Sequence, residues 1–314
     1  MNPDAKAATV KALAENFERA WESGDVPVFD GHRIKLFVLA CQQLLDHGRL
    51  AAGEHAVRHL YAAHPTLHYA ATMAAVFDCT PDGPAPLIEF SDDPDADVQV
   101  IHRTGCDAVM LVFCGRLNRP GLPMQLIHRW FGRLPVSIIY LRDFQKLVGG
   151  AGYPSLGSNR EATVESLKSL ISHMGARRIY AYGNSGGSFP ALHYGLNLGA
   201  KAVLCMAGPT NLTAEFNRNM TAFSRELTEG PLKLPEYAVD MRPLYAVAEQ
   251  PPRVLYVYGT GFWNDRLWAE NMKGLPSVEL VPVEDCAEHK IVAEVLRRGL
   301  YPDLLRRFMA AGEN

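Results

Sequence analysis

The sequence predicts a mostly parallel α/β sheet with helices on both faces, preceded by a small all-helical domain. Two patterns indicate this architecture. The first 80 residues hold apolar side chains at helical spacing and no strand-like run, whereas short apolar runs alternate with helical patterns later in the chain. A third observation is a strand that leads through a glycine-rich turn directly into a helix, around residues 179–198.

The composition is that of a globular protein without a strong charge. The 314 residues are 48% hydrophobic and 21% charged, and the formal net charge is −3. These values exclude a largely disordered chain, and the lack of a basic surplus disfavours a nucleic-acid partner. The longest apolar runs, 69–77 and 108–114, are much shorter than the ~20 residues of a spanning helix, so no membrane span is expected.

Two features of the sequence predict a cytoplasmic protein. No secretory leader is expected, because Met1 to Lys6 show no basic segment followed by an apolar one. The six cysteines are scattered without a Cys-x-x-Cys pair. In a chain of this size they indicate reduced core residues rather than a disulfide framework.

The predicted helical domain spans residues 1–80. Four segments show helical periodicity: 10–21, 34–45, 51–63 and 67–77. Gly48 and Pro65 separate the last three, which is the punctuation of antiparallel helical hairpins. One hairpin resembles a degenerate tetratricopeptide repeat, whose signature positions fall near Phe37, Leu44, Gly48, Gly53, Leu60 and Pro65. A protein partner for these helices is therefore one hypothesis.

A turn-rich stretch at residues 80–84 marks the predicted boundary to a second domain, 81–314. Eight short apolar or alternating runs follow: 87–90, 98–102, 108–114, 136–141, 178–182, 202–206, 254–258 and 278–283. Helical patterns separate most of the later runs: 124–133, 160–174, 189–198, 266–273 and 291–309. Eight strands connected in this way predict a mostly parallel eight-stranded sheet with helices on both faces.

The sharpest motif is Gly183-Asn184-Ser185-Gly186-Gly187, which lies between a β-branched and aromatic strand and a helix. In this context a Gly-x-Ser-x-Gly sequence predicts a nucleophile elbow, a tight turn in which side chains two residues either side of the serine would clash. The alternative is an ordinary glycine-rich turn or a phosphate cradle. No dinucleotide or P-loop fingerprint supports that alternative.

A serine nucleophile needs a histidine base and a carboxylate that orients the base. The expected order is serine, acid, histidine, and only His193 and His289 follow Ser185. His193 falls in the helix after the turn, whereas His289 falls in the loop after the last predicted strand. Asp265 follows the preceding strand and is the predicted acid, with Glu270 as a weaker alternative.

Acyl transfer also needs two hydrogen-bond donors for the developing oxyanion. The predicted donors are the backbone N–H of Gly186 and that of Gly115 or Arg116, in the loop after the third predicted strand. Cys114 ends an apolar strand and is interpreted as a buried thiol.

From about residue 86 to the end, the chain resembles the α/β-hydrolase superfamily. The resemblance rests on Cys114-Gly115, on the motif around Ser185, and on Asp265 and His289 after their strands. It implies a Ser–His–Asp catalytic triad and an acyl-serine intermediate. Many esterases carry a His-Gly sequence at the oxyanion loop, and Cys114-Gly115 departs from that pattern.

The substrate pocket is predicted from residues near these loops. The candidates are Asn184, Tyr153, Phe216, Phe262 and Trp263. The glycine-rich segment 143–154 is either a connector or a pocket wall. The long insertion 212–250 is a possible lid, with a helix packed on the sheet edge as the alternative.

No metal and no other cofactor is expected. His55 and His59 are four residues apart on one predicted helix, but no His-Glu-x-x-His motif occurs, so packing or solvated histidines are the better interpretation.

The sequence thus predicts a serine hydrolase that acts on an ester or thioester of a small molecule, an acyl ester or a glycan ester. One alternative is an acyltransferase that uses the same triad. A second alternative, from another class, is a non-catalytic interaction protein that uses the N-terminal helical hairpins.

Overall fold

The computed structural model describes residues 2–81, 90–218, 220, 221, 225, 230, 233, 234 and 236–311. The chain divides into two compact units. The first unit comprises Met1–Asp92, Leu122–Arg133 and Leu296–Gly299. The second comprises Asp93–Gly121, Leu134–Val295 and Leu300–Asn314. The sequence-based boundary near residue 80 stays a prediction.

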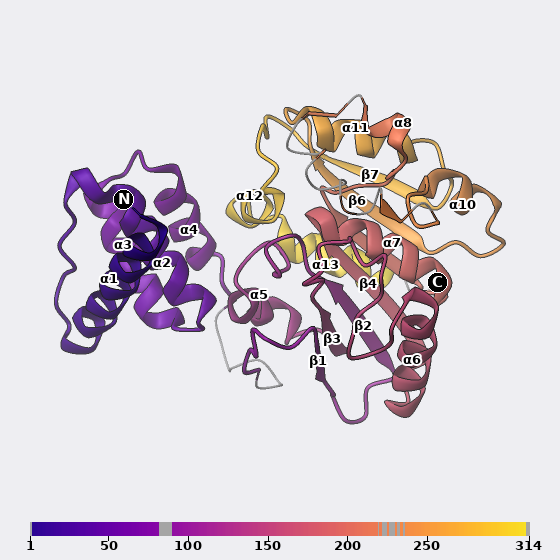
Figure 1. Ribbon diagram of the computed structural model, residues 1–314, viewed down its shortest axis with the longest axis horizontal. Coiled ribbons are helices and arrows are strands. Elements are labelled where there is room, and N and C mark those ends of the chain that lie inside the picture. The colour runs from indigo at the N-terminus through magenta and orange to yellow at the C-terminus, as the bar shows by residue number, and fades with distance from the viewer. Residues whose placement is uncertain are drawn as a thin grey trace. The chain divides into compact units, whose positions relative to one another are not determined.

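The first unit is built from helices that pack in sequence order (Figure 1). Its helices are α1 (Pro3–Ser23), α2 (Ile34–Asp46), α3 (Leu50–Ala63), α4 (His68–Asp78) and α5 (Met124–Phe131). A Cβ on Gly53 would collide with the Leu45 side chain, so the glycine lets α3 approach α2 closely. Phe17, Phe29 and Phe37 form an aromatic cluster with ring centroids 5.2 to 6.1 Å apart. The tetratricopeptide-like interpretation of these helices stays a prediction.

The second unit contains a mostly parallel sheet. The described residues form seven strands: β1 (Val98–Ile101), β2 (Ala108–Phe113), β3 (Ser137–Leu141), β4 (Arg178–Asn184), β5 (Ala202–Met206), β6 (Arg253–Gly259) and β7 (Val278–Val283). Their order is β1-β3-β2-β4-β5-β6-β7, and β1 alone is antiparallel to its neighbour. The expected strand at 87–90 lies outside the described residues except for Phe90, which is in no regular element. The central strands β2, β3 and β5 are fully buried, as their continuous apolar runs predict.

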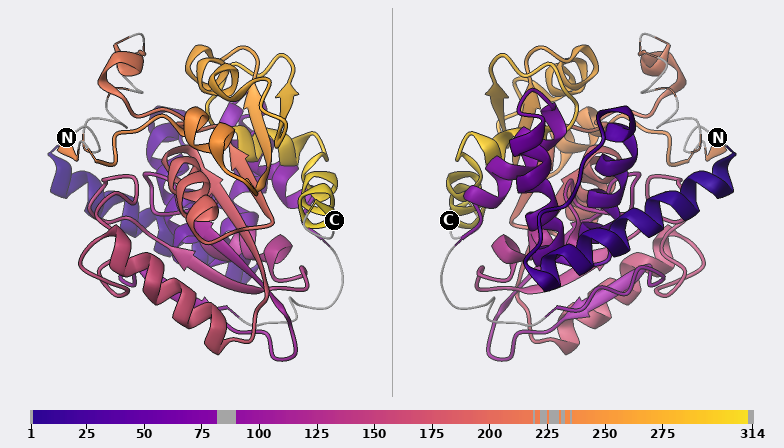
Figure 2. Two further views of the ribbon diagram at one scale, coloured as in Figure 1. Left: turned by 90° about the vertical axis from the view of Figure 1, so that its right-hand side faces the viewer. Right: turned by 90° about the vertical axis from the view of Figure 1, so that its left-hand side faces the viewer.

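Helices of the second unit cover both faces of the sheet. In the left-hand view of Figure 2, α6 (Arg160–His173) and α7 (Ser188–Asn197) lie in front of the strands. Consecutive residues of β4 show the two faces: a Cβ on Gly195 in α7 would contact Ala181, whereas the Tyr180 ring packs on Phe308 with centroids 5.5 Å apart. Phe308 belongs to the last described helix, which comes from the other side.

The remaining helices of this unit are short. They are α8 (Ala214–Asn217), α10 (Met241–Val247), α11 (Trp263–Met272), α12 (Ile291–Arg297) and α13 (Tyr301–Ala310). The single helix expected at 291–309 was wrong, since the chain turns at Gly299, whose φ of +69° is a left-handed conformation that ends α12 and allows α13 to start afresh.

The predicted lid, 212–250, falls partly outside the described residues. In its described part, Tyr237 and Met241 are fully buried and belong to the core, whereas Val247 is exposed. No helix among the described residues is long and apolar enough to cross a membrane.

Candidate active site

Ser185 stands in a sharp turn between β4 and α7. Its φ of +51° is in the left-handed region, which non-glycine residues rarely adopt. A Cβ on Gly183 would collide with the carbonyl of Gly187, and a Cβ on Gly187 would collide with the carbonyl of Phe113. The turn is therefore packed backbone against backbone, which explains why glycine occupies the positions two residues either side of the serine.

Three side chains from three separate segments form one hydrogen-bonded chain. Ser185 Oγ lies 2.7 Å from His289 Nε2, and His289 Nδ1 lies 2.8 Å from Asp265 Oδ1. Because a carboxylate accepts a hydrogen bond from Nδ1–H, the neutral imidazole has its free lone pair on Nε2, where it can accept the serine proton. Ser185 follows β4, Asp265 lies in the first turn of α11, and His289 lies in the loop between β7 and α12.

Asp265 is the buried end of this chain. Its side chain has no exposed surface, and its Oδ2 atom has no hydrogen-bond partner among the described residues. Burial raises the pKa of the Asp265 carboxyl, while the hydrogen bond and the charge of His289 act in the opposite direction. The pairing with His289 is thus the interaction that favours the carboxylate form in a dry environment.

Aromatic rings surround the histidine. The ring centroid of Phe262 lies 5.6 Å from that of His289, and the centroid of Trp268 lies 6.3 Å away. The His289 side chain retains 13% of its exposure. These rings restrict water around the imidazole while one edge stays accessible to a ligand.

Backbone hydrogen bonds join the loop before α11, the helix of Asp265, to the loop that carries His289. Gly261 N–H donates to the carbonyl of Cys286 at 2.9 Å, and Thr260 N–H donates to the carbonyl of Val283 at 3.1 Å. A Cβ on Gly259 would lie only 2.6 Å from the Cys286 carbonyl oxygen. The buried Cys286 is therefore part of the junction that sets the spacing between acid and base.

Tyr256, on β6, holds the segment after β5 against the serine turn, and sequence reasoning did not identify it. Its hydroxyl donates to the carbonyl of Gly208 and accepts the N–H of the same residue at 3.2 Å. A Cβ on Gly208 would collide with the carbonyl of Ser185. In the sequence Tyr256 is one more residue of an apolar strand, so no local signal points to this contact.

Gly115, Arg116 and Gly186 meet beside the serine. A Cβ on Gly115 would lie 2.9 Å from the carbonyl of Asn184, and a Cβ on Gly186 would lie 3.8 Å from the backbone nitrogen of Arg116. Gly115 N–H donates to the carbonyl of Arg119 at 3.0 Å. Because that donor is engaged within its own turn, Arg116 is the better candidate of the two to supply a backbone N–H toward Gly186.

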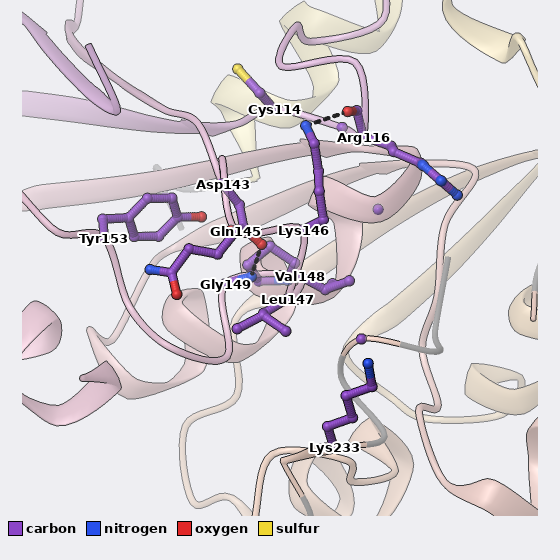
Figure 3. Close-up of a pocket in the computed structure, with 14 residues that line it drawn as sticks. Cys114, Arg116, Asp143, Gln145, Lys146, Leu147, Val148, Gly149, Tyr153 and Lys233 are labelled. Carbon is purple, nitrogen blue, oxygen red and sulfur yellow. Dashed lines mark hydrogen bonds between the residues drawn. The ribbon is translucent and has the colours of Figure 1, made fainter. Parts of the chain in front are cut away.

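A pocket of about 390 Å³ opens next to Gly186 (Figure 3). Its described lining consists of residues 114–116, 143, 145–149, Tyr153, Gly186, Pro190, Gly230 and Lys233. The segment expected to be a connector or a wall thus contributes much of this lining. Lys146, which sequence reasoning did not single out, donates through Nζ to the carbonyl of Arg116 and to Oδ1 of Asn118, both at 2.6 Å.

Of the other predicted pocket residues, only Tyr153 is among the described lining of this pocket. Asn184 is buried and donates from Nδ2 to the carbonyl of Met206 at 3.3 Å. Trp263 is half exposed beneath the guanidinium of Arg266, and Phe216 packs partly buried against the core. Phe262 faces His289 as described above.

The described residues contain no group of three or more His, Cys, Asp or Glu side chains close enough together to hold a metal ion. His55 and His59 form an edge-to-face ring pair with centroids 4.5 Å apart.

No protein-family model matches the chain, and no curated protein matches its sequence. Solved structures similar to it include esterase B from Lactobacillus rhamnosis, at 12% identity and a TM-score of 0.50, covering 80% of this chain and 95% of that one. An α/β-hydrolase enzyme from the metagenome of Mar Chica lagoon sediments is 13% identical with a TM-score of 0.47, covering 72% and 99%. The metagenomic carboxylesterase EstE1 is 14% identical with a TM-score of 0.42, covering 75% and 97%. Together with the order and direction of its strands, the likeness to esterase B shows that the chain has the α/β-hydrolase fold.

Proposed function

We propose that the protein is a serine hydrolase that cleaves a carboxylic ester or thioester through an acyl-serine intermediate at Ser185. The observation that carries the proposal is the pair of short hydrogen bonds from Ser185 through His289 to Asp265. A structural serine needs neither a histidine at 2.7 Å nor a buried carboxylate behind that histidine.

The first half-reaction forms the acyl-enzyme. Ser185 Oγ attacks the substrate carbonyl carbon while its proton passes to His289 Nε2, and the imidazolium is stabilised by the Asp265 carboxylate. The tetrahedral intermediate collapses when the bond to the leaving oxygen or sulfur breaks and His289 returns the proton to that atom. The products of this step are a free alcohol or thiol and an ester of Ser185.

The oxyanion of the tetrahedral intermediate needs donors on the far side from His289. The backbone N–H groups of Gly186 and Arg116 fit this role, because the two residues approach one another beside the serine. Such a donor contributes about a hundredfold to a thousandfold in turnover when it is preorganised.

The second half-reaction releases the acid. Water gives a proton to His289 as its oxygen attacks the acyl carbon. The bond between the acyl carbon and Ser185 Oγ then breaks, His289 returns the proton to Oγ, and the carboxylic acid leaves. If an alcohol or amine takes the place of water, the same steps transfer the acyl group.

A fluorophosphonate probe tests the proposal, since it forms a covalent bond only with an activated serine. We expect intact-mass analysis to find one adduct on the wild type, none on Ser185→Ala, and one on the control Ser172→Ala, whose serine is exposed on α6. An adduct that persists on Ser185→Ala contradicts the proposal. So does a folded wild type that neither reacts with the probe nor hydrolyses short acyl esters.

A further inference from the structure

The pocket beside Gly186 has a positive lining. Arg116, Lys146 and Lys233 contribute cationic side chains, and Asp143 contributes the one described carboxylate (Figure 3). Asp143 Oδ2 accepts the N–H of Gly149 at 2.9 Å, so this carboxylate is engaged in holding the pocket wall. Among the described residues, no carboxylate forms an ion pair with Lys146 or Lys233. Lys146 and Lys233 thus give the pocket positive charge that is engaged in no described ion pair, with the carboxylate of Asp143 nearby.

Lys146 retains a donor for a ligand. Its ammonium group donates to two neutral acceptors, the carbonyl of Arg116 and the side-chain amide of Asn118. An ammonium has three N–H donors, so two such bonds leave a third. Burial lowers the pKa of Lys146, with the Asp143 carboxylate acting in the opposite direction. A bound anion would offset this cost of desolvation.

Tyr153 offers a second donor from the opposite wall. Its side chain is only 1% exposed, yet its hydroxyl has no hydrogen-bond partner among the described residues, and Figure 3 shows it directed into the pocket. The ring is fixed by Phe113 and Tyr194, with centroids 6.2 and 6.0 Å away. The hydroxyl is not among the fully buried atoms without a partner, so it opens onto the cavity, where a fixed phenol offers a hydrogen-bond donor to an acceptor on the ligand.

The pocket lies on the acyl side of the reacting serine. Its described lining includes Gly186 and Arg116 but no residue from the loops that carry Asp265 and His289. Because His289 must give its proton to the leaving group, that group lies toward His289. The acyl chain then extends the other way, into this pocket.

We propose that the pocket binds an acyl chain that ends in an anionic group, a carboxylate or a phosphate, held by Lys146 and Tyr153 with Arg116 and Lys233 nearby. The substrate is then an ester of an acid that carries a second negative group. The position of the ester in this inference rests on the proposed function. The binding of an anion rests on the pocket alone.

Two para-nitrophenyl esters test it, the adipate half-ester and a neutral isostere in which a methyl ketone replaces the free carboxylate. We expect the wild type to prefer the anionic ester by about tenfold or more in kcat/KM, the usual worth of charge-assisted hydrogen bonds. Lys146→Met is expected to abolish the preference, and Tyr153→Phe, which keeps the ring, to reduce it severalfold. The control Lys201→Met removes an exposed charge just before β5, at the other end of the strands, and is expected to keep it.

A binding measurement separates this inference from the proposed function. Calorimetric titration of Ser185→Ala with free adipate and with inorganic phosphate is expected to show binding, and the added substitution Lys146→Met is expected to raise the dissociation constant about tenfold. The anion that binds more tightly identifies the end group. If neither ester is hydrolysed but this binding occurs, the hydrolase proposal fails and the anion site stands. Equal kcat/KM for the two esters, a preference that Lys146→Met leaves intact, or no anion binding would overturn the inference.

Discussion

The turn that holds Ser185 and the pocket wall beside it are held in place by different kinds of contact. Around Ser185 the chain packs backbone against backbone, because Gly183, Gly187 and Gly208 have no side chains to keep neighbouring carbonyls apart. The wall at 143–153 is held by side chains that reach its backbone from elsewhere. Tyr237 donates to the carbonyl of Val148 at 2.8 Å, for example. The turn thus depends mainly on the absence of side chains, whereas the wall is held in addition by hydrogen bonds from distant side chains.

This difference predicts how each region tolerates change. A methyl group added to a glycine of the turn would displace a neighbouring backbone segment. Removing a hydroxyl that donates to the wall would only loosen the loop 143–153. We therefore expect the first region to govern whether the reaction occurs and the second to govern which substrate is preferred. The following substitutions test that division, from the largest expected effect to the smallest.

Asp265→Asn is expected to lower kcat by about ten-thousandfold while the protein stays folded. The amide preserves the shape of the side chain but favours the wrong tautomer of His289. Burial raises the pKa of Asp265 in the folded state. The free energy of unfolding therefore falls as the pH rises from about 3.9, the ordinary pKa, to the folded-state pKa, and this loss stays constant at higher pH. Urea unfolding at neutral pH should therefore find the variant no less stable than the wild type.

The control for this variant is Glu270→Gln on the same helix, which is expected to retain activity. A fully active Asp265→Asn would contradict the assignment of Asp265 as the orienting acid.

Gly187→Ala is expected to destabilise the fold by about 3 kcal/mol, at the upper end of the range for overpacking, because the new Cβ would collide with the Phe113 carbonyl. Gly186→Ala is the matched control, since a Cβ there meets no atom nearer than 3.8 Å. The free energies of unfolding in urea measure both. Equal stability of the two variants would show that the turn can relax, against the close packing described above.

His193 packs on Tyr237, with ring centroids 5.0 Å apart, and its burial makes the stability of the fold depend on pH. Burial, followed by the nearby charge of Arg160, lowers the pKa of His193 from 6.5 to about 4. The unfolded chain therefore binds the proton more tightly. Stability is fully present above pH 6.5 and falls by at most about 3 kcal/mol as the pH drops toward 4.

Urea unfolding across that pH range measures the effect. His193→Gln should show a flatter profile than the wild type, and the exposed control His173→Gln should keep the wild-type slope. Parallel profiles for all three proteins would mean that His193 does not set the acid sensitivity.

The same contrast explains what the sequence could predict. Strands β2, β3 and β5 could be placed to within a residue because buried parallel strands are continuous apolar runs. That Ser185, Asp265 and His289 would meet could also be predicted, because the carboxyl ends of parallel strands lie at one edge of the sheet. The catalytic roles of the three stay a prediction.

Lys146 and Tyr256 could not be predicted, because each acts on backbone that is distant in sequence. Lys146 reaches the carbonyl of Arg116, and Tyr256 reaches Gly208. Neither contact leaves a periodicity or a motif in its own segment. The break between α12 and α13 did have a local signal, the glycine at 299, but the apolar periodicity on either side of it concealed the turn.

Tyr237→Phe is the mildest test of the division between turn and wall. The hydroxyl is buried and donates to the Val148 carbonyl, so its removal is expected to cost about 1 kcal/mol of folding free energy. Because Val148 lines the pocket, the wall should also become looser. We expect KM for the adipate half-ester to rise a fewfold while kcat for short neutral esters stays unchanged.

Tyr245→Phe is the matched control, since it removes an equally buried hydroxyl that donates to the carbonyl of Leu192 at 3.0 Å, away from the pocket lining. A similar loss of stability in both variants, with a KM change only in Tyr237→Phe, would show that the hydrogen bond to Val148 shapes the pocket as well as the fold. If both variants change KM alike, stability alone controls substrate preference. A fall in kcat in Tyr237→Phe would mean that the wall also positions the reacting groups, because looser binding by itself leaves the chemical step unchanged.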